Sequence, residues 1–379
     1  MDYASATPIH PKVMKAMKPW LENDFANPAG LYGEGVKAKQ ALEEARVKVA
    51  RVLQCRSEEI IFTSGGTESD NLAIQGVVIT AKPKLKGTHI ITSVIEHPAV
   101  LEVCRSLEKW ATKVSYLPVD NLGHIPLSQL EKSITEETCL ITLAYANSEI
   151  GTVNPVREIG KIVKKFREKN KSVYPYLHID AGQAPLFYPV RPNELGVDLI
   201  TLDAAKLYGP KGSGALFVRR NIKITPILHG GKQERGLRAG TENVAGAVGL
   251  AEAISIVTTD QKRESVRLTK LRDLFIKKVL ENFPESMLNG DPVKRLPNNV
   301  NICFPGTDGE FAVIKLDNAG VACASASSCR ALSDESYSYV VEALGKKNCA
   351  ESSLRFAFGK DTTEKEVLEV VKTISKKLK

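Results

Sequence analysis

The sequence predicts an α/β protein in which a mostly parallel β-sheet is covered by helices and a smaller α+β domain follows. Two observations lead to this prediction. From about residue 59 to residue 218, short apolar runs rich in β-branched residues alternate with helical patterns, which is typical of parallel strands joined by helices. After a long helical region the order of the elements changes.

Six runs in the first part are predicted to be strands buried on both faces, because they are short, apolar and β-branched. They are EIIFT (59–63), THIIT (88–92), CLITLAY (139–145), YPYLHID (174–180), DLITL (198–202) and ALFV (215–218). Apolar residues at i, i+3 and i+4 predict helices between them, as in AVLEVCRSLEKW (99–110) and VREIGKIVKKF (156–166).

A long helix is predicted from about 244 to 283, and it leads into the second part. There we expect strands in NNVNICF (298–304), VACAS (321–325) and SLRFAF (353–358), and helices in GEFAVIKLDNAG (309–320), in SYSYVVEALG (336–345) and at the end of the chain. The predicted domains are a large α/β domain, 12–250, and a small α+β domain, 251–379 together with 1–11.

The composition is that of an ordinary globular protein, with 43% hydrophobic and 25% charged residues among 379. The net charge of +8 and the pI near 9.0 favour an anionic ligand or partner. However, the lysines are dispersed, as in KPKLK (82–86). Such runs are usually solvated faces, so we do not expect nucleic-acid binding.

The cysteines are odd in number and no C-x-x-C pair occurs, so we expect free thiols in a reducing compartment rather than a disulfide framework or a zinc site. The seven are Cys55, Cys104, Cys139, Cys303, Cys323, Cys329 and Cys349. The start, MDYASATPIHPK, has no signal-like region, and the most apolar helical run, 244–257, is interrupted by Glu252. We therefore expect no membrane span and a cytoplasmic protein.

Polar groups follow the carboxyl end of five predicted strands. The segments are SGGTESDN (64–71), SVIEH (93–97), ANSEIG (146–151), DAGQ (180–183) and DAAK (203–206). In open α/β sheets the ligand binds beyond the carboxyl ends of the strands. One edge of the sheet is therefore predicted to collect these side chains around a ligand.

Taken alone, each of these groups has two interpretations. The glycines before Thr67 form either a plain capped helix or a phosphate site at a helix N-terminus. Asp180 ends an apolar strand either as an ion pair or cap, or as a carboxylate that keeps a ring nitrogen protonated. His97 is either a cap or a flat surface against a planar ligand. Lys206 is either a solvated charge or a reactive amine.

Taken together, the groups describe one cofactor. Pyridoxal 5′-phosphate needs a lysine for its aldehyde, an aspartate for its ring nitrogen and a cradle for its phosphate. Lys206, Asp180 and the glycine-rich helix start supply these three, so the sequence predicts a pyridoxal-phosphate site.

The same residues carry a family resemblance over essentially the whole length. The chain resembles the cysteine desulfurases of the NifS/IscS kind, which are class V aminotransferases of the fold type I pyridoxal-phosphate enzymes. The matching motifs, in order, are MDYASATP, FTSGGTESDNLAIQG, IEHPAV, NSEIGTVNPV, HIDAGQ, KLYGPKGSGALFVRR, HGGKQERGLRAGTENV, GVACASASSC and LRFAFGKDTTEKEV.

The resemblance implies a sheet of the seven-stranded type and a role for each matching residue. It assigns Lys206 to the aldehyde, Asp180 to the ring nitrogen, and His97 to stacking on the ring and to catalysis. It also assigns Gln183 to the phenolic oxygen of the cofactor. Gly66 and Thr67 would bind the phosphate, with Thr241 reaching it from the other subunit of a homodimer. Asn147 and Arg355 would bind the substrate, and Cys329 would be the catalytic cysteine.

The implied reaction removes sulfur from L-cysteine, gives L-alanine and leaves a persulfide on Cys329. A sulfur-acceptor protein would then take the sulfur for iron–sulfur cluster assembly or tRNA thiolation. The small residues of CASASSCRALS (323–333) favour a segment that can move with its thiol. The alternative for Cys329 is a small buried hydrophobe, and Cys323 is expected to be structural.

The chain departs from the family pattern in three places. Asp203, Ala204 and Ala205 stand where the family usually has Ser-Gly-His, and Ser148 stands where it commonly has asparagine. The chain also ends soon after its last predicted helix, without the longer tail that contacts the acceptor in some members. If the backbone follows the family, the Asp203 carboxylate lies near the phosphate and weakens cofactor binding.

Three functions therefore stay open at this point. The first is an active cysteine desulfurase. The second is a selenocysteine lyase or another class V pyridoxal-phosphate enzyme, such as an aminotransferase. The third is a non-catalytic dimeric scaffold with impaired cofactor binding.

Overall fold

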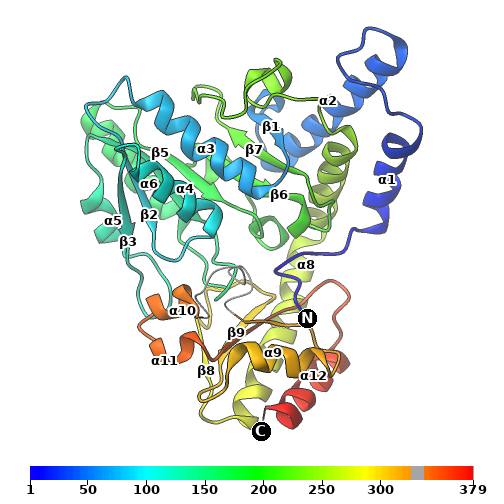
Figure 1. Cartoon of the computed structure of the whole chain (residues 1–379), viewed down its shortest axis with the longest axis vertical. Helices are drawn as coiled ribbons and strands as arrows, with labels where there is room; N and C mark the ends of the chain where they lie inside the picture. Colours follow the sequence, from blue (N-terminus) through cyan, green and yellow to red (C-terminus); the bar gives the residue numbers. More distant parts are fainter. Residues whose placement is uncertain (326–336, 379) are drawn as a thin grey trace.

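Two β-sheets joined by one long helix organise the chain, as the computed structural model in Figure 1 shows. The structure describes residues 1–325 and 337–378. The larger sheet lies in the upper part of the view, coloured blue to green, and the smaller sheet lies below it in the part coloured yellow to red, where both ends of the chain also lie.

The larger sheet has seven strands in the order β1-β7-β6-β5-β4-β2-β3. Its strands are β1 (Ile60–Thr63), β2 (His89–Ser93), β3 (Lys113–Leu117), β4 (Thr138–Ala144), β5 (Tyr176–Asp180), β6 (Leu199–Asp203) and β7 (Gly214–Val218). Strands β3, β2, β4, β5 and β6 pair in parallel, while β7 is antiparallel to both of its neighbours. The predicted α/β fold with a mostly parallel sheet is confirmed.

Helices cover both faces of this sheet, because alternate strand residues point to opposite sides. Ile61 and Leu140 pack in the core beneath α3 (Gly66–Ala81) and α4 (Pro98–Glu108). Their neighbours Ile60 and Ile141 pack on the other face, in a core that includes residues of α2 (Gly33–Leu53), α5 (Leu127–Ser133) and α6 (Val156–Asn170).

The predicted long helix is confirmed as α8 (Val244–Asn282), which has 39 residues. The side chain of Asn243 caps its first turn by accepting from the backbone N–H of Gly246. Its first half packs on α1 (Pro11–Glu22) and α2, and it also contacts α12 (Glu364–Lys377) and β9 (Asn299–Cys303). No helix in the described part of the chain, α8 included, has the length and apolar character of a membrane span.

The smaller sheet is antiparallel, in the order β10-β11-β9-β8. Besides β9 it contains β8 (Met287–Leu288), β10 (Ala324–Ser325) and β11 (Ser353–Ala357), and the helices α9 (Gly309–Asp317), α10 (Tyr339–Ala343) and α11 (Lys347–Ala350) accompany it. The N-terminus joins this sheet through a bridge between Asp2 and Ala357. The predicted domain boundary at residue 250 falls inside α8 and stays a prediction.

A disulfide connects Cys303 of β9 to Cys349 of α11, so the prediction that all the cysteines are free is wrong for these two. The sequence shows only that they are 46 residues apart, whereas the fold brings their Cα atoms to 5.3 Å, within the range that a disulfide spans. Cys55, Cys104, Cys139 and Cys323 are free thiols. Cys329 lies outside the described residues.

Candidate active site

A cavity of about 400 Å³ lies at the carboxyl edge of the large sheet, between this sheet and the small one. Eight of the residues singled out from the sequence line it: Gly66, Thr67, His97, Asn147, Asp180, Gln183, Lys206 and Arg355. Thr241 is exposed and does not line the cavity of its own chain. The roles of these residues stay predictions, but their convergence is a property of the fold.

The N-terminal end of α3 opens into this cavity at Gly66 and Thr67. Gly65 precedes the helix with φ +150°, a backbone conformation that L side chains rarely adopt, and no side chain in the described residues caps this end. The first N–H groups of a helix have no partner within the helix, and the helix dipole adds positive charge there. This end of α3 is therefore suited to an anion.

Lys206 reaches the cavity from a 3-10 turn, Ala204–Lys206, which follows β6 directly. The carboxylate of Asp203 caps the turn by accepting from the N–H of Ala205 at 3.0 Å. The Lys206 ammonium donates to the carbonyl of Ser5. The strand end and its cap thus hold the amine at the cavity.

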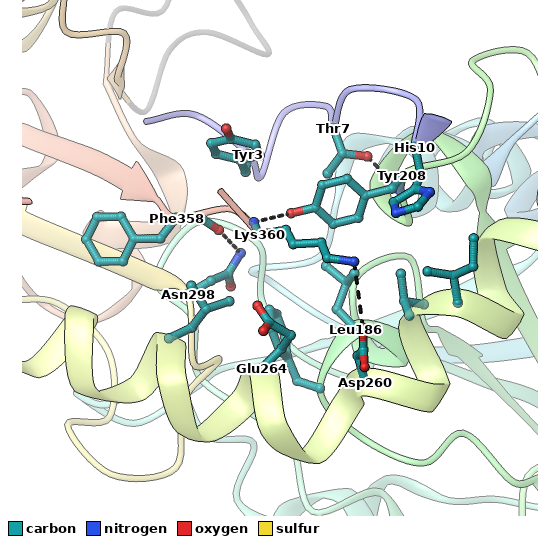
Figure 2. A pocket seen from close by; sticks show the side chains of 14 residues that line it. Tyr3, Thr7, His10, Leu186, Tyr208, Asp260, Glu264, Asn298, Phe358 and Lys360 are labelled. Carbon is teal, nitrogen blue, oxygen red and sulfur yellow. Dashed lines mark hydrogen bonds and ion pairs between the residues drawn. The ribbon is translucent and has the colours of Figure 1, made fainter. Parts of the chain in front are cut away.

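Thr7 fixes the turn that bears Lys206 through three hydrogen bonds. Its N–H and its hydroxyl both donate to the carbonyl of Ala205 at 2.9 Å, and its hydroxyl accepts from the N–H of Tyr208 at 2.7 Å. Tyr208 has a φ of +61°, a strained conformation for a non-glycine residue that persists only where the surroundings enforce it. Figure 2 shows the next contact, in which the hydroxyl of Tyr208 accepts from the N–H of Lys360 at 2.7 Å. Residues on both sides of Lys206 are therefore fixed by other parts of the chain.

Asp180 ends β5, and its carboxylate accepts from the N–H of Gly182 at 2.9 Å. Burial raises the pKa of Asp180, while His97 and Lys206 oppose this effect. His97 begins α4, where its Nδ1 accepts from the N–H of Ala99 at 3.1 Å. Burial lowers the pKa of His97, so its ring favours the neutral form.

Two residues of the cavity present buried polar atoms without a hydrogen-bond partner in the described residues. Gln183 donates from Nε2 to the carbonyl of Ala4 at 3.1 Å, but its Oε1 has no partner. Arg355 donates from Nη2 to Asp2 at 2.9 Å and to Ser5 at 2.7 Å, but its Nε has no partner. Buried polar groups normally have partners, so these atoms point to a polar ligand.

Asn147 is differently placed, because its side chain is already fully engaged. Its Nδ2 donates to the carbonyl of Ile95 at 2.8 Å, and its Oδ1 accepts from the N–H groups of Glu149 and Ile150. In this structure Asn147 holds the turn after β4 in place at the wall of the cavity.

Sequence reasoning missed the contribution of the N-terminal segment, residues 2–7, to the site. Its atoms contact Arg355, Gln183 and Lys206. No periodicity in so short a segment could have shown this, and the motif MDYASATP was the only signal. Asp70 was also missed: it is almost fully buried at the cavity, its Oδ1 accepts no hydrogen bond in the described residues and lies 3.7 Å from Nε2 of His178, and burial together with Asp180 raises its pKa.

The residues present fit pyridoxal 5′-phosphate at its aldehyde and ring. An amine, a carboxylate and a flat neutral imidazole converge on one cavity, and the partnerless atoms of Gln183 and Arg355 are oriented for polar partners. The N-terminal end of α3 fits an anion such as a phosphate. One feature opposes the phosphate, namely the carboxylate of Asp203 beside this helix end.

Comparisons with known proteins agree with this geometry. A family model described as aminotransferase class-V matches residues 1–370. A cysteine desulfurase IscS of Dictyoglomus turgidum is 44% identical, covering 100% of this chain and 95% of that protein. A solved NifS-like protein superposes with a TM-score of 0.91 at 34% identity, covering 100% of this chain and 98% of that one.

A third similar protein is the solved structure of SspA in complex with cysteine. It has a TM-score of 0.81 and 31% identity, and the match covers 94% of this chain and 97% of that one. The likeness to the IscS protein and to the NifS-like structure extends over the whole chain. The chain therefore belongs to the aminotransferase class-V family and, within it, to the cysteine desulfurases of the IscS kind.

Proposed function

We propose that this chain is a pyridoxal-phosphate-dependent cysteine desulfurase, which removes sulfur from L-cysteine and releases L-alanine. The observation that carries the proposal is the convergence of Lys206, Asp180 and Arg355 on one cavity. An amine, a carboxylate and a guanidinium in that arrangement suit an amino-acid substrate and a cofactor with an aldehyde and a ring nitrogen.

Bound pyridoxal 5′-phosphate supplies an electron sink for the bond changes at the substrate's α-carbon. Lys206 would hold the cofactor's aldehyde and, once displaced, take the proton from that carbon. Asp180 would hold a proton on the ring nitrogen, and the neutral ring of His97 would cover the cofactor. Gln183 would face the phenolic oxygen, and Gly66 and Thr67 would hold the phosphate.

Arg355 is the group that would bind the substrate carboxylate. Its guanidinium is pre-oriented by Asp2 and Ser5, and its partnerless Nε is a free donor in a buried place. Arginine can bind a carboxylate through two parallel hydrogen bonds, which fixes orientation as well as position; because Nη2 already donates to Asp2 and Ser5, the second bond here would replace one of these two. The amino and thiol ends of the substrate are then directed by the same contact.

Cys329 would receive the sulfur. In this step the thiolate of Cys329 bonds to the substrate sulfur as the carbon–sulfur bond breaks, and the carbon takes a proton to give alanine. Cys329 lies outside the described residues, but it is four residues from Ser325, which lines the cavity. Four residues of extended chain span at most about 14 Å, so the thiol is within chain reach of the site.

A homodimer with composite sites is part of the proposal. Thr241 is exposed and lies outside its own cavity, where it is available to a second chain. Large apolar side chains are also exposed between α1 and α2 and on the helix ends beside this connection: Leu21, Phe25, Leu31, Tyr32 and Val36. A protein rarely leaves such a group in contact with water unless a partner covers it.

We further propose that a sulfur-acceptor protein, either an iron–sulfur scaffold or a tRNA-thiolation protein, takes the persulfide sulfur in the cytoplasm. The Cys303–Cys349 disulfide removes part of the argument from free thiols. The proposed location therefore depends on the sulfur-transfer role.

The test is to incubate the purified protein with L-cysteine, pyridoxal phosphate and a thiol reductant, and to measure sulfide and alanine together. We expect equal amounts of the two products, and none from a Lys206→Ala variant. Alanine without sulfide, or pyruvate in place of alanine, would show a different reaction on the same cofactor. An L-selenocysteine assay run in parallel separates a selenocysteine lyase from a cysteine desulfurase.

A further inference from the structure

The end of the cavity at the N-terminus of α3, which is suited to an anion, also contains a negatively charged side chain, Asp203. Asp203 ends β6, three residues before Lys206, and lines the cavity. A Cβ atom built on Gly66 would lie 3.4 Å from the Oδ2 of Asp203. The carboxylate is therefore packed against the first turn of α3, the helix end that is suited to a phosphate.

The two carboxylate oxygens of Asp203 are used differently. Oδ1 accepts from the N–H of Ala205 at 3.0 Å and so stabilises the lysine-bearing turn. Oδ2 is the atom next to Gly66. Within residues 1–325 and 337–378, no lysine or arginine forms an ion pair with this carboxylate.

The charged groups near Asp203 do not neutralise its carboxylate. Asp70 and Asp180 are further acids at the same cavity. Arg238, which reaches the first turn of α3, is already paired with Glu68 at 2.9 Å. Lys206 also lines the cavity, but its amine would hold the cofactor's aldehyde rather than its phosphate.

We propose that Asp203 is a specificity-determining residue that weakens binding of the cofactor's phosphate at the N-terminal end of α3. As a result, the chain distinguishes pyridoxal 5′-phosphate from unphosphorylated pyridoxal only poorly. The inference rests on the proposed function, since it assigns the phosphate of that cofactor to this helix end. The physical reason is repulsion between the Asp203 carboxylate and the phosphate. Two like unit charges about 4 Å apart at an effective dielectric of 20 repel strongly enough to weaken binding roughly a thousandfold, before water in the cavity screens them.

The matched variants are Asp203→Asn and Asp203→Glu. Asparagine keeps the shape of the side chain and an oxygen that can accept from Ala205, but it removes the charge. Glutamate keeps the charge. If asparagine disturbs folding, as judged by the thermal unfolding midpoint, Asp203→Ser removes the charge with a smaller side chain that still caps a turn.

The experiment titrates cofactor-free protein with pyridoxal 5′-phosphate and, separately, with pyridoxal, and follows the visible absorption of the bound aldehyde. We expect Asp203→Asn to tighten binding of the phosphorylated cofactor by at least about tenfold, or about 1.4 kcal/mol, and to change pyridoxal binding by less than about twofold. Asp203→Glu is expected not to tighten either. Equal effects on both ligands, or no effect of asparagine on the phosphorylated one, would overturn the proposal.

A measurement of inorganic phosphate binding distinguishes failure of this inference from failure of the proposed function. Its binding, measured by isothermal calorimetry on the cofactor-free protein, needs neither Lys206 chemistry nor activity. Tighter phosphate binding by Asp203→Asn supports the role of Asp203 even if no aldehyde binds. If no variant binds the aldehyde, the proposed function fails, and unchanged phosphate binding would then refute the role of Asp203 as well.

Discussion

At the scale of single residues, burial decides which cysteines can act as nucleophiles. Only the thiolate attacks sulfur, so a thiol held in its neutral form is inert. Burial raises the pKa of each of the four free cysteines in the described part of the chain to about 12. The proposed chemistry therefore needs another thiol, and Cys329 is the remaining cysteine outside the disulfide.

We expect Cys329→Ser to abolish sulfide release from L-cysteine while leaving the visible absorption of bound cofactor unchanged. Serine cannot accept the sulfur, but the cofactor site does not depend on the thiol. Cys323→Ser is the matched control, because Cys323 is buried and its thiol is held neutral. Full activity of Cys329→Ser, or loss of activity in Cys323→Ser alone, would contradict the assignment.

Glu96 shows how the buried acids around the cavity link stability to pH. Its carboxyl accepts from the hydroxyl of Ser93 at 2.6 Å and from the N–H of Ala144 at 2.7 Å. Burial nevertheless raises the pKa of Glu96 to about 8, against an ordinary value of 4.5. Because its pKa is raised in the folded state, its contribution to stability is full below pH 4.5 and is lost as the pH rises through about 8.

We therefore expect Glu96→Gln to remove a pH dependence of stability. Glutamine imitates the protonated acid, since its oxygen can accept from Ala144 and its amide can donate to Ser93. The variant should match the wild type near pH 5 and be more stable at pH 9, by no more than about 5 kcal/mol. Urea unfolding at several pH values measures the difference, and a variant that is less stable at pH 9 would be the contrary result.

At the scale of elements, the disulfide ties β9 to α11 across 46 residues of chain. Closing a loop of this length in the unfolded state corresponds to about 4 kcal/mol of stability in the chain-entropy model. We expect a reductant to lower the free energy of unfolding by about that amount in the wild type, and to have no such effect on Cys303→Ala.

Counting free thiols tests directly whether Cys303 and Cys349 form the disulfide. Thiol titration of the unfolded, unreduced protein should find five thiols, that is seven cysteines less the two in the disulfide, and seven after reduction. Seven thiols before reduction would show that the bond does not form in solution.

How far the sequence predicts the elements depends on their burial. All six runs predicted as strands of the large sheet overlap an observed strand with ends within two residues, because each is apolar and buried on both faces. The edge strand β3, KVSYL, was not predicted, since it is half-exposed and mixes polar with apolar residues. The two-residue β8 was missed because no pattern can be seen in so short a segment.

The sequence likewise predicts one part of the candidate site and not the other. Lys206, Asp180 and His97 follow strand ends or begin a helix, so the topology alone places them at one edge. The contacts of residues 2–7 with them, and the pairing of Cys303 with Cys349, join segments distant in sequence. Such contacts depend on the packing of the two sheets against each other, which no local pattern encodes.

At the scale of the whole molecule, the proposed dimer predicts a particle of about twice 41.4 kDa by light scattering. Thr241→Ala should weaken binding of pyridoxal phosphate by about tenfold, because a hydrogen bond to a charged group is lost. A fully active particle of 41.4 kDa would refute the composite site.

A mixed dimer tests which chain supplies the threonine. In a dimer of one Lys206→Ala chain and one Thr241→Ala chain, the site that keeps Lys206 receives an intact Thr241 from the other chain. We expect this site to bind the cofactor as tightly as the wild type. Weak binding there would mean that Thr241 serves its own chain.

The path of α8 has a consequence for how the chain unfolds. One continuous core contains Phe62 and Leu177 of the large sheet, Phe275 of α8, and Ile302 and Phe356 of the small sheet. On this face of the large sheet, the hydrophobic interiors of the two sheets are therefore continuous with each other. A cut after residue 250 would divide α8 and leave two fragments that each expose half of this core, so neither fragment is expected to fold alone. Calorimetry should accordingly show a single endotherm with equal calorimetric and van 't Hoff enthalpies, the signature of one cooperative unit rather than two.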